Sequence, residues 1–344
     1  MSKHRIVLVG CGGISRAWLN AVTTHFNDRV ELVGLVDLNV DNCRARQADF
    51  GLEGIPVSDD FGGMLADLKP DAVFNCTTPN AHHPLVLQAL RAGCHCLVEK
   101  PLANTVEQGR ELVEAAKTAG KTFAVIQNRR YDPNIRTVRG IVAAGTLGTV
   151  HTVNVDFYKG VHFGGFREEM EHVLLLDMAI HTFDQGRFIV GGQPVSVYCR
   201  EYNPPGSWFR HDASAQAMFT LSDGTVYNYR GSWCADGFQT SWQGSWRLVG
   251  EKGTLLWDGE DGIQVEVIDP DRDGSASGYR SVDVVHEERP PASCGHAGVI
   301  EDFLNALDSG DDPLTVGYDN IHSLAMVEKA IESAETGQVV DIHT

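Results

Sequence analysis

Two ionisable side chains, four residues apart, interrupt a strongly apolar stretch in the second half of the chain. Asp177 and His181 lie within residues 174–184, where most neighbouring side chains are Leu, Met, Ala, Ile or Phe. On a helix this spacing places both side chains on one face. Because burying ionisable groups is costly unless they line a pocket, the pattern predicts a catalytic site. There His181 would move a proton near neutral pH, and Asp177 would orient the imidazole or bind a substrate hydroxyl.

Two other interpretations of these residues stay open. The Asp–His pair could be purely structural. It could also hold a metal ion, since Asp177, His181 and Asp184 share a helix face and His162 could join them. The spacing lacks a further strong ligand such as cysteine, so we predict no metal.

A lysine marks the second candidate position for chemistry. Lys100 follows the strand-like run 95–98 in the sequence Glu99-Lys100-Pro101. In doubly wound folds, ligands bind beyond the carboxyl ends of the strands, so Lys100 would face a ligand crevice. It could stabilise a developing oxyanion, or act as the base itself if its pKa were depressed. The alternative is an ordinary surface lysine, and Pro101 indicates a fixed turn in which a cis bond is one option.

A glycine-rich turn follows the first apolar run of the chain. The sequence Gly10-Cys11-Gly12-Gly13-Ile14-Ser15 comes after residues 6–9 and opens a helix-like stretch. Gly10 permits a tight turn, and Gly12 leaves room for a pyrophosphate at the helix N-terminus. Ser15 stands where the fingerprint has a third glycine. Asp37, 22 positions after Ser15, would accept hydrogen bonds from ribose hydroxyls and repel a 2′-phosphate, which predicts NAD rather than NADP.

The elements needed to position these residues alternate regularly in the first part of the chain. Apolar runs alternate with helix-like stretches, a pattern typical of a parallel sheet covered by helices. The runs are 6–9, 30–36, 72–75, 95–98 and 123–126, and the helix-like stretches are 15–26, 40–50, 84–92 and 106–119. We therefore predict an α/β fold with a Rossmann-type doubly wound sheet over residues 1–127.

The pattern changes after residue 127. Alternating apolar and polar residues separated by turn signals predict a large, open, mostly antiparallel sheet with one packed face. Its strands are expected at 150–158, 195–202, 213–221, 226–233, 241–249 and 254–257, and helices at 134–144, 173–190, 297–307 and 320–334. Residues 128–344 would form a substrate-binding and oligomerisation domain of the α+β class. Its last helices, about 296–335, would pack back toward the first domain, and 269–278 reads as a mobile loop.

Composition narrows the class of protein further. With 28 Lys and Arg against 46 Asp and Glu, the formal net charge is −18, which argues against nucleic acids and anionic membranes as partners. The eight cysteines form no Cys-x-x-Cys pair, so zinc-ribbon and thioredoxin-like sites are not indicated. Scattered thiols, no signal peptide and no long apolar span predict a soluble cytoplasmic protein.

Taken together, four motifs resemble those of the glucose–fructose oxidoreductase and inositol dehydrogenase family (Gfo/Idh/MocA). They are Gly10-Cys11-Gly12-Gly13-Ile14, Cys76-Thr77-Thr78-Pro79-Asn80, Glu99-Lys100-Pro101 and Asp177-x-x-x-His181. The resemblance covers almost the whole chain and implies that Lys100, Asp177 and His181 surround the reacting carbinol carbon. It also implies that Thr77, Thr78, Pro79 and Asn80 contact the nicotinamide half of the cofactor, with Glu99, Lys100 and Gln127 belonging to the same site.

The resulting prediction is an NAD-dependent oxidoreductase that acts on a CH–OH group of a sugar, sugar derivative or polyol. Tyr158 and His162, with Trp208, Arg210 and Trp233, are candidate contacts to the sugar. A redox-neutral enzyme that retains its NAD, such as an NAD-dependent glycosidase or epimerase, is the alternative, and a non-catalytic regulatory homologue is a third. An open sheet and five tryptophans in the second domain predict a homo-oligomer, a dimer or tetramer.

Overall fold

The computed structural model describes residues 3–269 and 278–344. Unit 1 consists of Met1–Tyr131 and Arg289–Leu324, and unit 2 of Asp132–Glu288 and Ala325–Thr344. The loop expected at 269–278 falls almost entirely outside the described residues.

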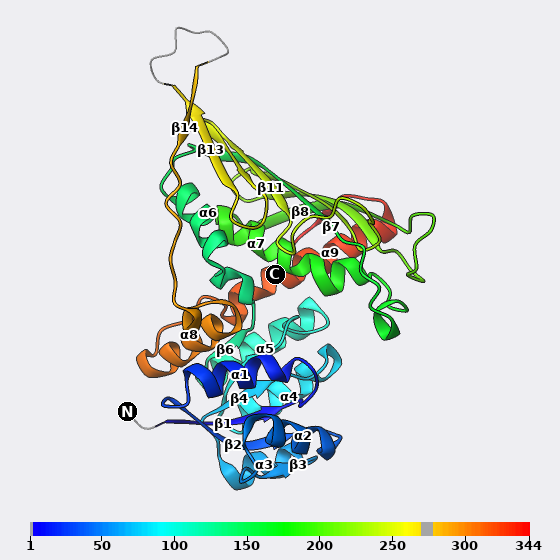
Figure 1. Ribbon diagram of the computed structural model, residues 1–344. Helices are drawn as coiled ribbons and strands as arrows, with labels where there is room; N and C mark the ends of the chain where they lie inside the picture. The colour runs from blue at the N-terminus through cyan, green and yellow to red at the C-terminus, as the bar shows by residue number, and fades with distance from the viewer. Residues whose placement is uncertain (1–2, 270–277) are drawn as a thin grey trace. The chain divides into compact units, whose positions relative to one another are not determined.

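Unit 1 is built on a six-stranded sheet whose strand pairs all run parallel (Figure 1). The strand order is β3-β2-β1-β4-β5-β6, which is the doubly wound order with a topological switch point between β1 and β4. The strands are β1 (His4–Val9), β2 (Val30–Val36), β3 (Val57–Ser58), β4 (Ala72–Asn75), β5 (His95–Val98) and β6 (Phe123–Val125). The expected α/β fold with a Rossmann sheet is confirmed.

Helices cover this sheet because each turns apolar side chains toward the buried strands. Trp18 of the first helix is fully buried and lies edge-on to Phe74 of β4, with ring centroids 5.2 Å apart, and Phe303 approaches Phe74 from another helix at 6.0 Å. The helices of unit 1 are α1 (Ser15–His25), α2 (Val40–Phe50), α3 (Phe61–Leu68), α4 (Pro79–Arg91), α5 (Val106–Ala119) and α8 (Gly295–Ser309), followed by α9 (Gly317–Thr336), which runs on into unit 2.

The helix expected at 84–92 in fact begins at Pro79, so this expectation was wrong at its N-terminal end. Pro84 looked like a starting residue, but Thr78 is the N-cap and Pro79 occupies the first turn, where a missing N–H costs nothing. The sequence pattern also missed β3 and α3. The first turn of α3 contains two glycines, and its start depends on Asp60, whose side chain accepts from the Gly63 N–H at 2.9 Å.

Unit 2 contains a nine-stranded sheet that is mostly antiparallel, as expected. Its order is β14-β13-β12-β11-β7-β10-β9-β8-β15, and β10 pairs with β7 in parallel. The strands are β7 (Val150–Tyr158), β8 (Pro194–Tyr202), β9 (Ser214–Leu221), β10 (Val226–Ser232), β11 (Ser245–Gly250), β12 (Gly253–Trp257), β13 (Ile263–Ile268), β14 (Tyr279–Val282) and β15 (Val340–Asp341). The pattern did not predict β13, β14 or β15.

One face of this sheet packs against helices (Figure 1). Helices α6 (Pro133–Ala143) and α7 (Ile180–Val190) lie along it, and Phe183 of α7 stacks edge-on with Phe219 and Tyr229 at 4.8 and 5.2 Å. Trp246 and Trp257 are also buried, 6.1 Å apart. The indole rings that motivated an oligomer therefore largely complete the core of unit 2 itself.

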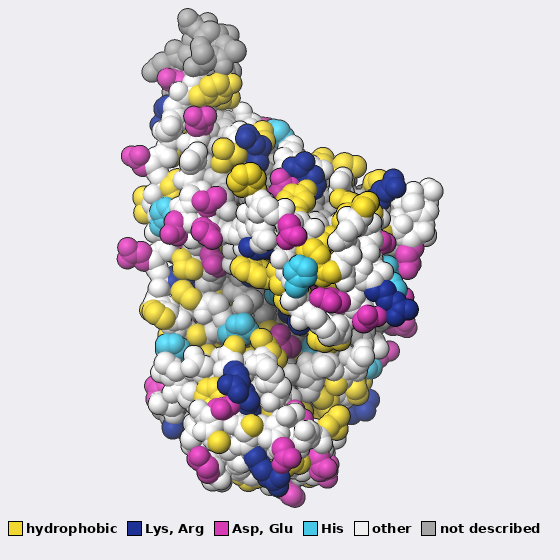
Figure 2. Space-filling view, turned by 45° about the vertical axis from the view of Figure 1, so that its right-hand side comes forward, with side chains coloured by type: hydrophobic (Ala, Val, Ile, Leu, Met, Phe, Trp, Pro, Cys, Tyr) yellow, Lys and Arg dark blue, Asp and Glu magenta, His cyan; other side chains and the backbone are white. Residues whose placement is uncertain are grey.

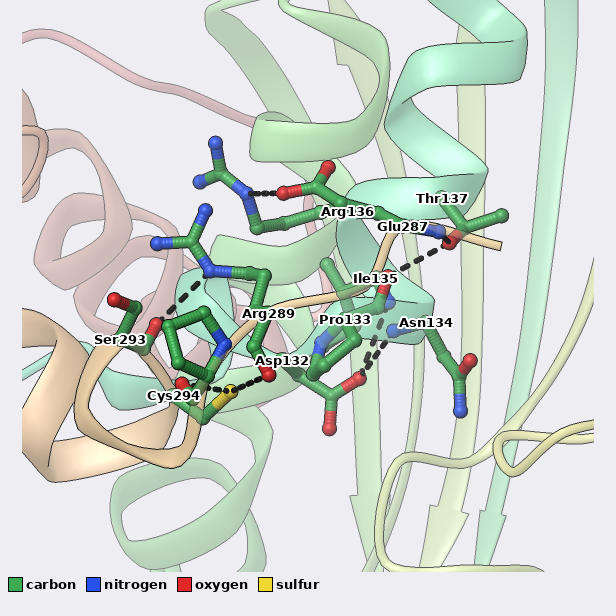
Figure 3. Close-up of polar contacts among 11 residues, drawn as sticks. Asp132, Pro133, Asn134, Ile135, Arg136, Thr137, Glu287, Arg289, Ser293 and Cys294 are labelled. Atoms are coloured by element: carbon green, nitrogen blue, oxygen red, sulfur yellow. Dashed lines mark hydrogen bonds and ion pairs between the residues drawn. The ribbon is translucent and has the colours of Figure 1, made fainter. Parts of the chain in front are cut away.

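The start of α6 is fixed by a dense set of polar contacts (Figure 3). Asp132 caps the helix by accepting from the N–H groups of Asn134 and Ile135 at 2.9 and 3.2 Å. Glu287 returns to the same turn, pairing with Arg136 at 2.7 Å and donating its backbone N–H to the Thr137 hydroxyl at 2.8 Å. These contacts join the last residues of the segment Asp132–Glu288 to its first helical turn.

Within the described residues, no helix combines the length and the apolar character needed to cross a membrane.

Candidate active site and cofactor site

The glycine-rich turn of unit 1 is tightly packed against the end of β4. Gly10 has φ +91°, and a Cβ there would lie 2.6 Å from the backbone of Cys76 and Thr77. The Gly10 and Cys76 N–H groups donate to Val36 and Val9 at 2.8 and 2.7 Å. Only glycine fits this left-handed, crowded position. Because Gly10 follows β1 and contacts the residues that follow β4, the turn lies at the switch point between these two strands.

The other two glycines face open space, as a phosphate cradle requires. A Cβ added at Gly12 or Gly13 would meet no atom within 4 Å. Among the described residues, the N–H groups of Gly12, Gly13 and Ile14 donate to no other group, and α1 has no side-chain cap. Unused N–H groups at a helix N-terminus are suited to binding phosphate. The residues present therefore fit a dinucleotide.

Asp37 follows β2 and holds the glycine-rich turn in place. One carboxylate oxygen accepts from the Cys11 N–H at 2.7 Å. The other accepts from the Asn39 N–H at 2.9 Å and from the Asn42 amide at 3.1 Å. The carboxylate that we expect to meet the ribose is thus already oriented by three protein donors.

The Thr77–Asn80 turn after β4 is organised from beneath by two side chains. Buried Asn75 accepts from the N–H and the hydroxyl of Thr77 at 3.1 and 2.6 Å. His82 has ring nitrogens 3.0 Å from the Thr77 carbonyl oxygen and 2.7 Å from the Pro101 carbonyl oxygen. Burial lowers the pKa of His82. This histidine links the turn after β4 to the turn after β5.

Glu99 supports Lys100 from within the protein. Its carboxylate accepts from the Trp18 indole at 2.8 Å and from the Lys100 N–H at 3.2 Å. The side chain is buried, and burial raises the pKa of its carboxyl group. The Lys100–Pro101 peptide bond is cis, the option that the sequence had indicated. Lys100 is itself half-buried.

Gln127 completes the row at the end of β6. It is 2% exposed, and neither its amide nitrogen nor its amide oxygen has a hydrogen-bond partner among the described residues. A buried, unsatisfied amide is costly, which favours a ligand that supplies the missing partners. Unit 1 thus gathers the predicted cofactor residues on one edge of its sheet, since parallel strands end together there.

The segment of unit 2 that carries the predicted catalytic residues differs from the continuous α-helix expected at 173–190. Residues Leu174–Ala179 form a π-helix, and α7 begins only at Ile180. Asp177 therefore lies on the wide turn and His181 on the first turn of α7. π-helical turns insert one extra residue per turn and are frequent at functional sites. The expectation that Asp177 and His181 share one regular α-helix was wrong.

An arginine that the sequence pattern did not single out contacts Asp177. The Nε of Arg167 donates to Asp177 Oδ2 at 2.8 Å, and the two side chains are 35% and 19% exposed. Arg167 lies in the short 3₁₀ turn Gly165–Arg167, ten residues before its partner. No periodic signal connects these positions, so only the folded loop reveals the pair.

The predicted sugar contacts lie around the loop that carries Arg167. Tyr158 ends β7, and exposed His162 stacks on Trp208 with ring centroids 3.8 Å apart. Trp233 is buried and packs against Phe163 at 4.6 Å. Within unit 2, Trp233 therefore acts as a support for the loop.

The interpretation of Asp177 and His181 as metal ligands requires a group of ligand side chains close together. No cluster of three or more His, Cys, Asp or Glu side chains is placed to hold an ion there. Asp184 is buried beside Arg187, 3.8 Å away on the next turn of α7. The His162 ring stacks on Trp208.

Comparisons with known proteins match both parts of the chain. A family model described as the oxidoreductase family with an NAD-binding Rossmann fold matches residues 4–127, and one described as the GFO/IDH/MocA C-terminal domain matches residues 135–256. An uncharacterized protein of Sinorhizobium fredii is 30% identical over 98% of this chain and 96% of its own length.

Two further relatives cover nearly the full length. D-apiose dehydrogenase of Paraburkholderia graminis is 27% identical over 99% of this chain and 90% of its own. The crystal structure of an oxidoreductase from Agrobacterium radiobacter, in complex with NAD⁺, L-tartaric acid and magnesium, superposes with a TM-score of 0.83. That protein is 22% identical, with 99% of this chain and 98% of the other covered, so the likeness concerns the fold.

Proposed function

The chain belongs to the Gfo/Idh/MocA family of oxidoreductases, and we propose from this membership and from its own residues that it oxidises a CH–OH group of a sugar, sugar derivative or polyol. Relatives named as dehydrogenases include those of D-apiose, inositol and a D-glucoside, all of them polyhydroxylated compounds. The observation that carries the proposal is the ordered cradle of unit 1. Its free N–H groups, oriented Asp37 and unsatisfied Gln127 amide all suit a nicotinamide dinucleotide.

Three side chains of this protein have separate roles in the proposed reaction. Nicotinamide adenine dinucleotide, when bound, accepts the hydride from the carbinol carbon. We assign the proton of the substrate hydroxyl to His181, whose unperturbed pKa is near neutral. Lys100 places a positive charge beside the oxygen as it becomes negative, and the Glu99 turn fixes its backbone. Asp177 grips a substrate hydroxyl or orients His181. Unit 1 is the cofactor domain in this proposal and unit 2 the substrate domain.

NAD is the proposed cofactor in preference to NADP because a 2′-phosphate would lie against the Asp37 carboxylate. Asp37→Asn removes the charge but keeps one oxygen that can accept from Cys11. We expect the NADP:NAD ratio of dissociation constants to fall by about tenfold or more in this variant. Titration of both cofactors into apo-protein measures the ratio, and a wild-type protein that binds NADP more tightly would contradict the assignment.

All eight cysteines are free thiols, six of them buried. Free thiols persist in reducing compartments, which supports a cytoplasmic location. Fractionation of the native host, with the protein followed by antibody, tests this.

The redox-neutral alternative uses the same residues and differs only in the fate of the hydride. A dehydrogenase releases an oxidised sugar and one NADH per turnover. An enzyme that retains its NAD releases an aglycone or an epimer with no net NADH. A screen of sugars, polyols and glycosides that follows absorbance at 340 nm together with product mass separates the two. Net NADH from a free sugar is the expected result, and turnover without NADH would favour the alternative.

A further inference from the structure

Large apolar side chains are left exposed in the loop between β7 and the π-helix. Phe163 is 38% and Phe166 69% exposed. The loop is nevertheless well anchored. His162 stacks on Trp208, whose indole donates to the Val161 carbonyl oxygen at 3.0 Å, and Phe163 packs on Trp233. Exposed aromatic side chains on a fixed loop indicate a surface that another molecule covers.

These two rings flank the guanidinium of Arg167. The guanidinium carbon lies 5.2 Å from the Phe163 ring centroid and 4.8 Å from that of Phe166. Cation–π contacts with two rings, together with the bond to Asp177, restrict the positions that the guanidinium can take. The direction in which Arg167 presents its remaining donors is therefore set before any ligand arrives.

Arg167 uses only part of its hydrogen-bonding capacity. Its Nε side is occupied by Asp177. In the part of the chain that the structure describes, its two terminal nitrogens make no hydrogen bond or ion pair, although the side chain is two-thirds buried. The terminal edge of a guanidinium binds a carboxylate through two parallel hydrogen bonds. One arginine can thus bridge two carboxylates, one at Nε and one at its end.

We propose that Arg167 binds a carboxylate of the substrate, so that the enzyme acts on a sugar acid, either an aldonic acid, a uronic acid or a glycoside of one. This inference rests on the proposed function, because that proposal places the sugar beside Asp177, the partner of Arg167. Without Arg167, the Asp177 carboxylate would repel a second carboxylate nearby. With Arg167 between the two, an acidic substrate is attracted while a neutral sugar leaves the terminal nitrogens unsatisfied.

A carboxylate fits this position better than a phosphate group does. A phosphate monoester carries nearly two negative charges and is commonly held by several cations. Two other cations near the loop already have partners among the described residues. Arg210 pairs with Glu169 at 2.9 Å, and the Lys159 ammonium lies 5.1 Å from the Trp242 ring. A single guanidinium that is already shared with Asp177 matches a monoanion.

Binding and turnover of matched ligands test the proposal in the protein loaded with cofactor. Each sugar is offered as the free sugar, as its uronic and aldonic acid, as the methyl ester of the acid and as the 6-phosphate. We expect the wild-type protein to bind one acid about 100-fold more tightly than its ester in calorimetry. Arg167→Met should lose this preference while binding the ester as before, and Arg167→Lys should recover part of it.

The control is Arg136→Met, which removes another arginine Nε–carboxylate pair of unit 2, at 2.7 Å and 27% exposure, far along the chain from the loop. It should leave the preference for acids unchanged. Equal binding of acid and ester by the wild-type protein, an equal loss for both in Arg167→Met, or tighter binding of the phosphate would each overturn the proposal. Acid-selective binding without turnover of any ligand would instead refute the proposed oxidoreductase activity and leave the role of Arg167 standing.

Discussion

In the proposed reaction Lys100 stabilises the negative charge that develops on the substrate oxygen and His181 accepts its proton, so removal of either side chain should affect the rate more than ground-state binding. We expect Lys100→Met and His181→Asn each to lower kcat by about 100-fold or more. NAD should still bind, because the Gly12 and Asp37 contacts are untouched. Steady-state kinetics with cofactor titration measures both quantities.

Lys117→Met provides the control, since that lysine is 78% exposed on α5 and pairs only loosely with Glu114 at 3.9 Å. Turnover by a folded Lys100→Met protein at the wild-type rate would contradict the role assigned to Lys100. If His181→Asn lowers stability but leaves turnover per folded molecule normal, the structural interpretation of the Asp177–His181 pair is supported instead.

At the residue scale, the sequence singled out candidate site residues where a local pattern marks them. Gly10 and Asp37 stand at fixed distances from a buried strand, and Asp177 and His181 stand out from an apolar run. Arg167 and His82 leave no such pattern, because each acts through a partner brought near by the fold. His82 joins carbonyl groups of Thr77 and Pro101, and nothing in the spacing of these residues announces the link.

At the scale of elements, the start of the π-helix depends on one histidine in a left-handed conformation. His172 has φ +51°, and its carbonyl oxygen accepts from the Leu176 N–H at 3.0 Å. Its Nδ1 lies 2.5 Å from buried Glu201 of β8, and its Nε2 lies 3.6 Å from Glu335 of α9. The entry to the segment that carries Asp177 is therefore held to a strand and a helix through one imidazole.

This arrangement gives the stability of unit 2 a defined pH dependence. The hydrogen bond to Glu201 raises the pKa of His172, with Glu335 and Glu171 adding in the same direction. Burial raises the pKa of Glu201, and Asp212 adds to this, although His172 opposes it. Above its unfolded pKa, His172 holds a proton in the folded state that the unfolded chain has released, so unfolding releases this proton and stability falls as pH rises.

The stabilisation by His172 should be complete below its unfolded pKa of about 6.5 and be lost as pH rises through the raised folded value. Thermal denaturation between pH 6 and 9 should show the melting temperature falling by several degrees. His172→Asn should flatten this slope, since asparagine tolerates the left-handed backbone but does not titrate. His151→Gln, an exposed histidine of β7, should leave the slope unchanged. An equally steep slope in His172→Asn would exclude the pair as its source.

Elements were predictable when they were long and periodic, and missed when they were short or held by tertiary contacts. The strand at 30–36 and the helices at 40–50 and 106–119 match the structure residue for residue. β15 has two residues and exists because it pairs with β8 at the edge of the sheet. The π-helix was not predictable, because apolar periodicity over 173–190 is compatible with either helical pitch.

At the scale of the whole molecule, the chain has a formal net charge of −18. On the face shown in Figure 2, Asp and Glu side chains are spread among basic and hydrophobic ones. On this face, the interspersed charges mark no single binding surface for a charged ligand. An acidic substrate would therefore need a local cation, which is the role proposed for Arg167.

The prediction of an oligomer now rests on the outer face of the nine-stranded sheet, because most of the tryptophans belong to the core of unit 2. Side chains alternate along the strands, and Tyr198, Met218 and Leu256 are 42%, 50% and 36% exposed on strands whose alternate residues are buried. Met218 lies directly opposite Tyr198 and Asn228 on its two neighbouring strands. Between Met218 and Leu256 the same row of the sheet carries Asn228, Asn154 and Arg247. This open face therefore mixes polar and apolar side chains, as the rim and core of an interface do, and a second copy of the chain would cover it.

Light scattering should therefore give a mass that is an even multiple of 37.6 kDa at micromolar concentration. Met218→Lys puts a charge on this face, between Tyr198 and Asn228, and should shift the mass toward the monomer while circular dichroism stays unchanged. Phe238→Lys is the matched control, because Phe238 is fully exposed in a loop away from the sheet strands and should not alter the mass. A monomeric mass for the wild-type protein at this concentration would refute the interface.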